Sequence, residues 1–547
     1  MDTAGGGNSL PSASCPDGQK RRVCYYYDAG IANVDYGAEH CMVPRRVDMA
    51  HALVRSYGLL DDMKRLRTRP ATEHEIRAVH DAEYIGLLRD LTPERFSADG
   101  SSSMRSKAEA FDVGKVLKYK NGGQSIDNPA IAGLWDYCQR YAGGSLAAAR
   151  ALASGEADIA INWSGGMHHA CKARASGFCY VNDISLAIKE LLRHFRRVLY
   201  VDIDVHHGDG VETEFLESRR VMTVSFHQRT MDFFPANKGF VNDVGEGKGK
   251  YRALNVPMKK GMDDEGYHRM FKPVMAKVME VFQPEAIVMQ CGADSLSGDR
   301  LGRLNLSIAG HAQCVAFLRS FNVPLLLLGG GGYTINHVAA CWCYETAVAV
   351  GKEIDDDIPT HWYDHYYKSQ GYKLHYPVSK ARRNDNTEKY ITEKINDVFN
   401  NLSELEKAMP SVQFKEPKGR SIDTKVLFYD SPPREEDDPM ERLQRRCQEI
   451  DQRCFYVELG KRQMALDTDP QLYRPEVVKK YHANLSSLTH KRRMRTVSAS
   501  ISFPFPYLEF RALRSHIAIQ LRPATTSFLA ASTSATSSFN CGQLQNT

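Results

Sequence analysis

The stretch of residues 197–210 constrains the fold of this chain more than any other. Residues 198–205 are a β-branched apolar run, the kind that fills a strand buried on both faces of a parallel sheet. Asp202, Asp204 and His206 interrupt the stretch at alternate positions, so in a strand their side chains share one face. Burying two unpaired carboxylates costs several kcal/mol, roughly more than such a strand can offset. A bound cation resolves the conflict, and Zn²⁺ suits carboxylate and imidazole ligands. The alternative is a structural network of Asp–His hydrogen bonds.

Strand and helix patterns alternate through the middle of the chain. Apolar runs predict strands at residues 23–28, 158–162, 198–205, 221–226, 286–290 and 323–328. Helical periodicity appears at residues 49–60, 181–195, 263–282, 307–321 and 335–350. Asp263 and Asp264 are candidate caps of the helix that begins there, and Pro273 should bend it. The alternation predicts an α/β fold, a mostly parallel sheet with helices on both faces.

The two ends of the chain lack this pattern. Residues 1–20 are rich in glycine, serine and proline without an apolar core, which predicts a disordered segment and no signal peptide. Residues 21–385 form the predicted folded domain. Residues 386–547 carry an acidic run at 435–438, a basic cluster at 491–495 and an end rich in serine, threonine and alanine. We expect this C-terminal extension to be mostly disordered with isolated helices, one of them at residues 390–407.

Composition excludes several classes of protein. A net charge of +5 on 547 residues is too small to imply nucleic-acid binding by itself. The 13 cysteines include no Cys-x-x-Cys pair, which argues against a disulfide scaffold or a cysteine-rich zinc module. Reduced thiols are typical of cytosolic and nuclear proteins. No apolar run reaches the length of a membrane span. We therefore expect a soluble intracellular protein.

Paired histidines follow the predicted strand at residues 158–162. His168 and His169 come after a Gly-Gly pair, and such histidines suit two general acid/base groups whose backbone approaches a substrate closely. Asp202 and Asp209 lie on the central strand and its loop, where each can orient one imidazole. The alternative is two surface histidines.

Two further strand ends carry polar groups. Asp294 follows the predicted strand at residues 286–290. With Asp204 and His206 it would provide three protein ligands and leave one position open, the pattern of catalytic rather than structural zinc. Tyr333 follows four glycines after the strand at residues 323–328, and its hydroxyl there would stabilise an oxyanion opposite the metal.

Five motifs together carry a family resemblance. The chain contains, in order, Gly-Gly-Met-His-His, Ser-Gly-Phe-Cys-Tyr-Val-Asn-Asp, Asp-Ile-Asp-Val-His-His-Gly-Asp-Gly, Asp-Ser-Leu-Ser-Gly-Asp-Arg-Leu-Gly and Gly-Gly-Gly-Gly-Tyr-Thr. From about residue 21 to about residue 442 the sequence resembles a class I zinc-dependent histone deacetylase, as a divergent member of that family. The resemblance implies the arginase-like α/β fold, with a mostly parallel sheet of about eight strands. It also makes residues 21–385 the catalytic domain.

The resemblance implies a function as well. The enzyme would be a zinc-dependent hydrolase that removes acetyl groups from N6-acetyl-lysine of histone tails, and thereby a chromatin regulator that represses transcription. Its implied cofactors are Zn²⁺ and K⁺. Its implied partners are acetylated histone tails and corepressor scaffold proteins, without sequence-specific DNA binding or membrane attachment. The implied location is the nucleus, with the cytoplasm as a second location.

Two alternative functions stay open. One is a catalytically weakened scaffold subunit of a repressor complex, and the complete set of metal and histidine motifs argues against it. The other is an amidohydrolase that acts on acetylpolyamines or other small amides. The Asp-Ser-Leu-Ser-Gly-Asp-Arg motif, at residues 294–300, favours the class I resemblance instead.

The family's catalytic residues map onto this chain one by one. The implied zinc ligands are Asp204, His206 and Asp294. The two implied histidine–aspartate dyads are His168 with Asp202 and His169 with Asp209, and the implied transition-state residue is Tyr333. We assign general base and general acid to His169, with His168 as its electrostatic partner.

The family's binding residues map in the same way. The implied acetyl-lysine channel consists of Gly177, Phe178 and Phe234, with Leu301 at its rim, although such aromatics are core residues about as often as channel walls. Asp127 matches the rim aspartate that holds substrate backbone amides. The implied residues of a structural potassium site are Asp202, Asp204, His206, Ser225 and Phe226. The implied residues of an internal acetate pocket are Met42, Arg46, Met167 and Cys179.

The chain departs from the family around the implied site. About eleven extra residues, 115–125, precede Asp127, and the loop at residues 227–243 is about two residues longer and lacks a Gly-Thr-Gly after Phe-Pro. Of three basic positions that hold an inositol phosphate in class I complexes only Arg300 remains, because Val43 and Asn336 occupy the other two. Ala340 replaces a further rim arginine. We therefore expect a weak response to inositol phosphates.

Overall fold

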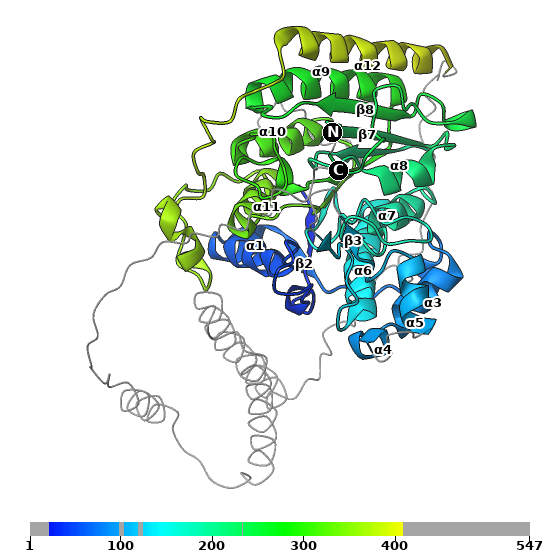
Figure 1. Cartoon of the computed structure of the whole chain (residues 1–547). Coiled ribbons are helices and arrows are strands. Elements are labelled where there is room, and N and C mark those ends of the chain that lie inside the picture. Colours follow the sequence, from blue (N-terminus) through cyan, green and yellow to red (C-terminus); the bar gives the residue numbers. More distant parts are fainter. Residues whose placement is uncertain (1–20, 98–102, 119–123, 232, 409–547) are drawn as a thin grey trace, which may run out of the picture. The chain divides into compact units, whose positions relative to one another are not determined.

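A parallel sheet lies at the centre of the computed structural model, which describes residues 21–97, 103–118, 124–231 and 233–408 (Figure 1). Its eight strands all run parallel in the order β2-β1-β5-β10-β9-β6-β7-β8. The strands are β1 (Val23–Tyr26), β2 (Lys64–Leu66), β5 (Ile159–Asn162), β6 (Val198–Asp202), β7 (Val221–Gln228), β8 (Ala253–Met258), β9 (Ala286–Gln290) and β10 (Leu325–Leu328). The predicted α/β fold with about eight parallel strands is confirmed.

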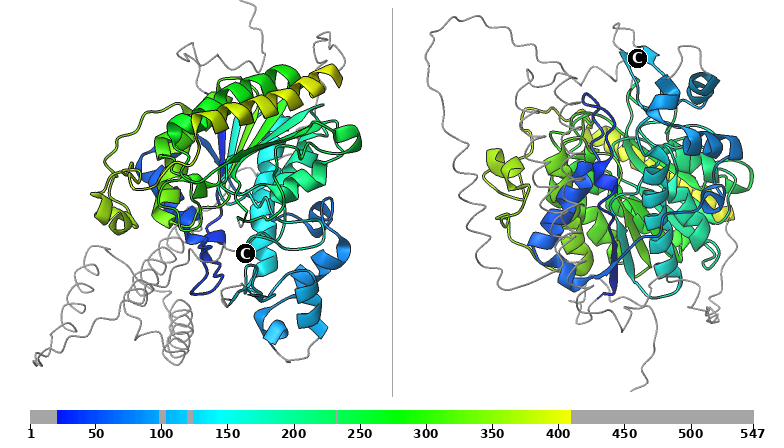
Figure 2. Two further views of the ribbon diagram at one scale, coloured as in Figure 1. Left: turned by 45° about the horizontal axis from the view of Figure 1, so that its top comes forward. Right: turned by 90° about the horizontal axis from the view of Figure 1, so that it is seen from below.

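Both faces of the sheet are covered, because strand side chains alternate between two apolar clusters. In β6, Leu199 and Val201 point into one cluster, while Val198 and Tyr200 point into the other. Figure 2 shows the sheet between its two helix layers. The helices of the first cluster are α1 (Arg45–Ser56), α9 (Asp264–Phe282), α10 (Ile308–Arg319), α11 (Ile335–Val350) and α12 (Glu388–Ala408). Those of the second cluster are α6 (Leu134–Ala153), α7 (Asp183–Leu191) and α8 (Asp209–Phe215).

A third apolar cluster joins α6 to a group of short elements, and it includes Tyr84, Ile85 and Tyr141. The short elements are α2 (Glu73–Ile76), α3 (Ala82–Asp90), α4 (Pro93–Ser97), α5 (Ser103–Ala110) and the two-stranded hairpin β3 (Leu117–Lys118) and β4 (Gln124–Ser125). Both strands lie among the roughly eleven extra residues, 115–125, that precede Asp127. The remaining turns of helix are the 3-10 segments Ile31–Asn33, Leu59–Asp62, Gly247–Gly249, Ala293–Ser295 and Asp364–Gln370.

The central strand ends earlier than its apolar pattern predicts. β6 stops at Asp202, so Asp204 and His206 lie in the loop beyond it and not on a continuing strand face. The backbone leaves the strand because its amides turn toward carboxylates: the Asp204 N–H donates to Asp202 at 3.1 Å, and the Val205 N–H donates to Asp294 at 2.8 Å. Asp204 and His206 therefore lie close together through the loop after β6, and not through a shared strand face as the sequence predicts.

α6 is the longest element that the sequence pattern misses. It contains Gly143 and Gly144 in its middle, and glycine there lowers helix propensity by about 1 kcal/mol relative to alanine. Both glycines allow close packing: a Cβ at Gly143 would lie 2.0 Å from the Arg69 carbonyl oxygen, and one at Gly144 would lie 2.6 Å from the Asn162 side chain. Contacts with distant segments thus stabilise a helix that local propensity disfavours at these two glycines.

Most other predicted elements lie within a few residues of their observed bounds. The strand at 286–290 and the helix at 335–350 coincide with β9 and α11. Asp263 caps α9 by accepting from the Gly266 N–H at 3.0 Å, whereas Asp264 accepts from Ser307 at the start of α10. Pro273 lies inside α9, which continues past it to Phe282.

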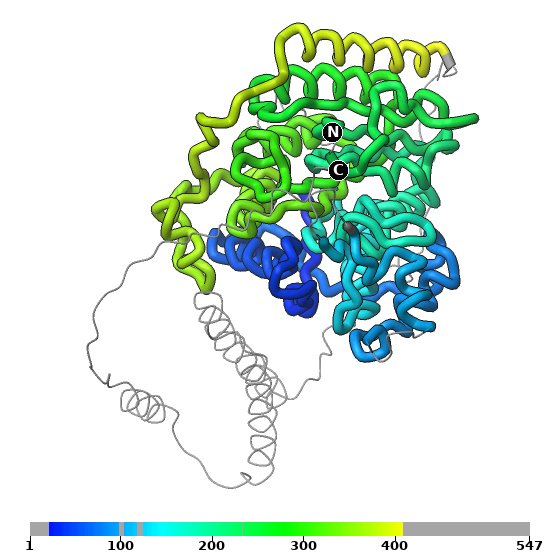
Figure 3. Tube along the Cα trace, viewed as in Figure 1, coloured from blue at the N-terminus to red at the C-terminus, as the bar shows by residue number. Residues whose placement is uncertain are grey.

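The folded part extends beyond the boundary predicted at residue 385. α12 lies alongside α9 (Figure 3) and buries Ile391, Val398, Leu402 and Leu405. Its apolar stripe therefore belongs to the main core, so it is not an isolated helix. The disorder predicted for residues 1–20 and for the extension past 408 falls outside the described residues. Within the described ranges, no helix combines the length and the apolar character that crossing a membrane requires.

Candidate metal centre and active site

The polar motifs follow four neighbouring strands and therefore lie at one edge of the sheet. β5, β10, β9 and β6 are adjacent, and their carboxyl ends lead to His168, Tyr333, Asp294 and Asp204 respectively. Loops at the carboxyl ends of parallel strands commonly build the site of an α/β protein. The structure thus brings together motifs that are far apart in the chain.

Asp204, His206 and Asp294 converge at this edge. Nδ1 of His206 lies 3.1 Å from Oδ1 of Asp204 and 3.1 Å from Oδ2 of Asp294. Both carboxylates are fully buried. Further donors fix Asp204: its Oδ2 accepts from the Gln290 side chain and from the Gly331 N–H, each at 2.8 Å.

The electrostatics of the three groups fit a bound cation. Burial and the charge of Asp204 raise the pKa of Asp294 to about 7. Burial opposes protonation of His206, yet the two carboxylates raise the pKa of this imidazole to about 10. Two buried carboxylates and one imidazole nitrogen therefore attract positive charge to a single point. A divalent cation that prefers oxygen and nitrogen ligands suits this donor set.

A second candidate group among the described residues consists of His311, Cys341 and Glu345. Nδ1 of His311 lies 2.7 Å from Oε1 of Glu345, and Nε2 lies 3.0 Å from the Gly292 carbonyl oxygen. Both ring nitrogens of His311 are thus engaged by oxygen atoms of the fold. Burial opposes a charge on this imidazole, but Cys341 and Glu345 hold the pKa of His311 well above its usual range. These contacts of His311 tie α10 and α11 to the turn that leads to Asp294, so this group serves to support that turn.

Two histidine–aspartate dyads stand beside the metal-ligand group. Nδ1 of His168 lies 2.8 Å from Asp202, and Nδ1 of His169 lies 2.8 Å from Asp209. The two imidazole centroids are 3.9 Å apart, and both rings are buried. This geometry brings together all four residues of the predicted dyads.

The two dyad histidines have opposite electrostatics. Burial and the neighbouring His168 lower the pKa of His169 to about 3. For His168, burial acts in the same direction, but Asp202 and Asp204 outweigh it and raise the pKa to about 9. One imidazole is therefore held neutral and the other is held charged.

Aromatic side chains and a glycine surround the dyads. The Phe234 ring meets His169 edge-on at 4.9 Å between centroids, and the Phe178 ring meets Tyr333 edge-on at 5.7 Å. Gly177 has φ +50°, and a Cβ there would lie 2.4 Å from His169 Cδ2. Gly177, Phe178 and Phe234 thus pack directly against His169 or Tyr333.

Tyr333 and Leu301 share one anchor. The carboxylate of the buried Asp299 accepts from the Tyr333 N–H at 2.7 Å and from the Leu301 N–H at 2.8 Å. Burial and the nearby Asp294 raise the pKa of the Tyr333 hydroxyl well above its usual value. The phenol therefore stays protonated and remains a hydrogen-bond donor.

Asp127 contacts Phe178 indirectly, through His40, despite the inserted residues before it. Its carbonyl oxygen lies 3.1 Å from His40 Nε2, and the His40 ring packs edge-on against Phe178 at 4.7 Å. Its carboxylate accepts from the Ser125 hydroxyl at 2.8 Å, and burial raises its pKa. The hairpin β3–β4, which contains the extra residues, thus holds Asp127 at its base.

The residues implied for potassium and acetate binding occupy two places. Ser225 of β7 pairs with Asp202 of β6, and Phe226 packs in the core behind it against Phe271. Arg46 is buried, donates to the carbonyl oxygens of Gly330 and Gly332, and lies 5.2 Å from the Trp342 ring. The other implied acetate residues, all buried in the cluster that also contains Tyr333, are Met42, Met167 and Cys179.

The positions implied in inositol phosphate binding differ in exposure. Arg300 is exposed, and Asn336 donates to the Gln370 side chain at 3.2 Å. Ala340 is fully buried in α11, so this position does not lie at a rim as the resemblance implies. The sequence comparison could not show this, because it aligns residues without their exposure.

Several residues that contact the site were not predicted from the sequence. Asp183 accepts from the backbone N–H groups of Gly166 and Met167, which lead into the paired histidines. Tyr200 donates to Asp202 at 2.6 Å, and Lys238 lies 3.1 Å from Asp209. Asp183 ends one of the motifs that carry the family resemblance, so the sequence contained a signal for it. Lys238 lies in a divergent loop and carries no motif signal.

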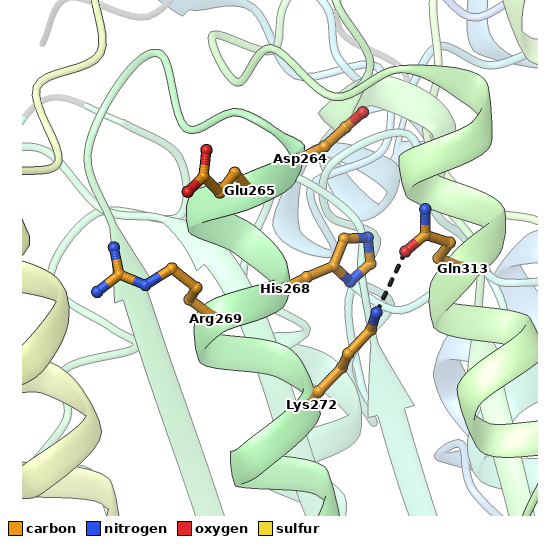
Figure 4. Close-up of a pocket in the computed structure, with 6 residues that line it drawn as sticks. All are labelled: Asp264, Glu265, His268, Arg269, Lys272 and Gln313. Carbon is orange, nitrogen blue, oxygen red and sulfur yellow. Dashed lines mark hydrogen bonds between the residues drawn. The ribbon is translucent and has the colours of Figure 1, made fainter.

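A surface pocket of about 410 Å³ lies elsewhere, between α9 and α10 (Figure 4). Several of its polar groups have partners of their own, since Lys272 donates to Gln313 and Asp264 accepts from Ser307. None of the lining residues carries a predicted catalytic, metal-binding or substrate-binding role. The buried group at the sheet edge is therefore the better candidate for the site.

Comparison with known proteins identifies the family of this chain. A family model described as "Histone deacetylase domain" matches residues 40–349. "Histone deacetylase 19" of Arabidopsis thaliana is 53% identical over 416 residues, which cover 76% of this chain and 78% of that protein. "Histone deacetylase 1" of Oryza sativa subsp. japonica is 54% identical over 412 residues, 75% of each chain. "Probable histone deacetylase 1-A" of Xenopus laevis is 47% identical over 426 residues, 78% of this chain and 83% of that protein.

Proposed function

The chain belongs to the histone deacetylase family, and from this membership we propose that it removes acetyl groups from N6-acetyl-lysine of histone tails by zinc-dependent amide hydrolysis. Its motifs agree with class I of that family. One observation carries the proposal: a buried Asp–His–Asp group converges beside two His–Asp dyads at the carboxyl edge of the sheet.

Asp204, His206 and Asp294 would hold the zinc ion. Two carboxylates and one imidazole leave room in a four-coordinate shell for substrate or water, as in catalytic zinc sites. When bound, zinc would polarise the acetyl carbonyl and acidify the attacking water. The Gln290 and Gly331 donors orient Asp204 for this task.

His169 would act as general base and then as general acid. Its Nδ1 faces Asp209, so the ring presents Nε2 to the reaction, and its lowered pKa keeps that nitrogen free to accept a proton. His168, whose Nδ1 lies 2.8 Å from Asp202, would stand beside it as the electrostatic partner that stabilises developing negative charge. The opposite pKa shifts of the pair favour this division of roles.

Tyr333 would donate its hydroxyl to the tetrahedral oxyanion, since its raised pKa keeps it protonated. Phe178 and Phe234 would enclose the apolar lysine stem, with Gly177 and Leu301 completing the channel. A charged, unacetylated lysine would be excluded by the cost of desolvation. Asp127 would accept hydrogen bonds from backbone amides of the substrate at the rim.

Two secondary sites extend the proposal. A potassium ion would bind near Asp202, Asp204, His206, Ser225 and Phe226 and stabilise the loop after β6. The released acetate would pass toward the buried guanidinium of Arg46, among Met42, Met167 and Cys179. Supporting this, Arg46 donates to backbone carbonyls and stands over an aromatic ring, so its positive charge stays available to an anion.

We also propose a setting for this activity. The enzyme would work in the nucleus, with the cytoplasm as a second location, and would join corepressor scaffold proteins. It would regulate chromatin and repress transcription through its substrate, without reading DNA sequence itself.

The direct test is hydrolysis of an acetylated histone-tail peptide by the purified full-length chain. We expect acetate release that stops when a chelator removes the metal and returns when zinc is added back. An N-acetylpolyamine serves as the matched second substrate, and we expect slower turnover of it. Zinc-loaded protein that turns over neither substrate would indicate a scaffold instead. Preference for the polyamine would indicate a small-amide hydrolase.

A further inference from the structure

Lys238 reaches the His169 dyad from the segment of residues 233–243, part of the connection between β7 and β8. Its Nζ lies 3.1 Å from Oδ2 of Asp209, while Oδ1 of the same carboxylate lies 2.8 Å from Nδ1 of His169. The Asp209 side chain is 3% exposed and that of Lys238 is 39% exposed. A cation that enters from the surface thus completes the pairing of a buried carboxylate.

The other dyad is held by different means. Asp202 accepts from the Tyr200 hydroxyl at 2.6 Å and from the Asp204 N–H at 3.1 Å. Both donors belong to β6 or to the loop directly after it, so the central strand of the sheet fixes them. Asp209 instead opens α8, and its second oxygen is held by a side chain 29 residues downstream.

The segment that carries Lys238 is itself anchored on the site. The Phe233 ring stacks on His206 at 5.0 Å between centroids, and the Phe234 ring meets His169 edge-on. On the other side of Lys238, the Gly239 carbonyl oxygen lies 2.9 Å from Nε2 of His227. Gly239 has φ +72°, and a Cβ there would lie 2.5 Å from that nitrogen. Because the backbone is held on both sides, the Lys238 side chain is directed toward Asp209.

Opposing effects act on Asp209. Burial disfavours the charged carboxylate, but the hydrogen bond to His169 and the charge of Lys238 outweigh burial and hold the pKa of Asp209 well below its usual range. His207 and Arg174 also act on this carboxylate through their charges. Loss of the ammonium would leave a buried oxygen without its partner, which costs more than losing an exposed ion pair.

We propose that Lys238 is a positioning residue for the His169 dyad. It fixes the Asp209 carboxylate, and that carboxylate fixes the imidazole that transfers the proton. The inference rests on the proposed function, because deacetylation is the reaction that gives His169 a proton to transfer. Lys238 lies in the loop that departs from the family pattern, so this chain uses a lysine contact where the family has a glycine-rich turn.

The test compares Lys238→Met with its conservative variant and with a matched control. We expect Lys238→Met to lower kcat about tenfold, the lower end of what the outer partners of site residues contribute, with KM little changed. Lys238→Arg should restore most of kcat, since a guanidinium can pair with the same oxygen. Lys248→Met, at an exposed lysine of the same β7–β8 connection, should match the wild type.

A double-mutant cycle identifies the route of the effect. In an Asp209→Asn background, Lys238→Met should cause no further loss, because the carboxylate that it positions is already neutralised. Hydrogen exchange at residues 233–243 should rise in Lys238→Met, while bound zinc stays constant.

Several outcomes would overturn the inference while the wild type remains active. These are an unchanged kcat in Lys238→Met, a loss confined to KM, or effects of the Lys238 and Asp209 changes that multiply. A wild type without deacetylase activity would instead contradict the proposed function.

Discussion

Asp204, at the floor of the proposed site, and Asp127, at its proposed rim, are both carboxylates that burial disfavours, yet different elements hold them. Asp204 accepts from the His206 N–H, from the Gln290 side chain and from the Gly331 N–H, groups that follow or end three different strands. Asp127 accepts from Ser125, at the end of an inserted hairpin. Three strands of the sheet thus fix the position of the Asp204 carboxylate. The position of Asp127 depends on local loops, which tolerate changes of sequence.

The strongest test of this contrast removes a floor residue. His206→Ala or Asp294→Asn should abolish deacetylation and lower bound zinc, because three protein ligands leave no substitute. Zinc content and acetate release are the measurements. His194→Ala, at an exposed histidine, is the control and should behave as the wild type. Full metal content with full activity in either ligand variant would show that the floor is assigned wrongly.

A smaller loss is expected where the floor meets the substrate. Tyr333→Phe should lower kcat by roughly 10²–10³-fold, the usual effect of removing one oxyanion donor, and should leave zinc content and the melting temperature unchanged. Steady-state kinetics and thermal unfolding check this. Tyr372→Phe, at a tyrosine that is 43% exposed, provides the control. An unchanged kcat in Tyr333→Phe would mean that another group stabilises the oxyanion.

The same contrast explains what the sequence could and could not predict. Buried strands have short apolar runs, and polar residues directly after such runs stand out, so His168, His169, Asp204 and Asp294 were identifiable before the structure. Their convergence was predictable too, because parallel strands share a carboxyl edge. The placement of Asp204 and His206 beyond the end of β6 was not, since it follows from hydrogen bonds to distant carboxylates.

Contacts between distant segments account for the other misses. α6 contains Gly143 and Gly144 because other parts of the chain pack closely there, which no local pattern reveals. α12 reads as a lone amphipathic helix until α9 is seen beside it. Lys238 pairs with Asp209 from a loop without a motif. Local sequence predicts what is buried and periodic, and it does not predict which loop residue will meet a buried charge.

At the rim we expect an effect on binding more than on chemistry. Asp127→Asn should raise KM for a histone-tail peptide about tenfold, because a charge-assisted hydrogen bond at a partly exposed site contributes about 1.5 kcal/mol. The value of kcat should change little. A small acetyl-lysine mimic without flanking amides is the matched substrate, and its KM should not respond. Equal effects on both substrates would place Asp127 in a structural role instead.

The smallest expected effect concerns anionic regulators. Val43 and Asn336 replace two of the three basic positions implied for inositol phosphate binding, and Asn336 is hydrogen-bonded to Gln370. Inositol tetrakisphosphate, titrated in the presence of a corepressor fragment, should therefore leave the activity nearly unchanged. Val43→Lys together with Asn336→Arg should introduce stimulation. Strong stimulation of the wild type at micromolar concentration would show that other basic residues bind the anion.

The position of β10 also bears on how the chain comes to be folded at all. This strand is synthesised last of the eight, yet it lies between β5 and β9, where Leu325 pairs with both Ile159 and Ile287. Until it emerges from the ribosome, the sheet is two separate halves, β2-β1-β5 and β9-β6-β7-β8. The paired histidines belong to the first half and the metal ligands to the second. The two halves can therefore join only near the end of synthesis, and until then β5 and β9 each have an unpaired edge, a feature that favours aggregation.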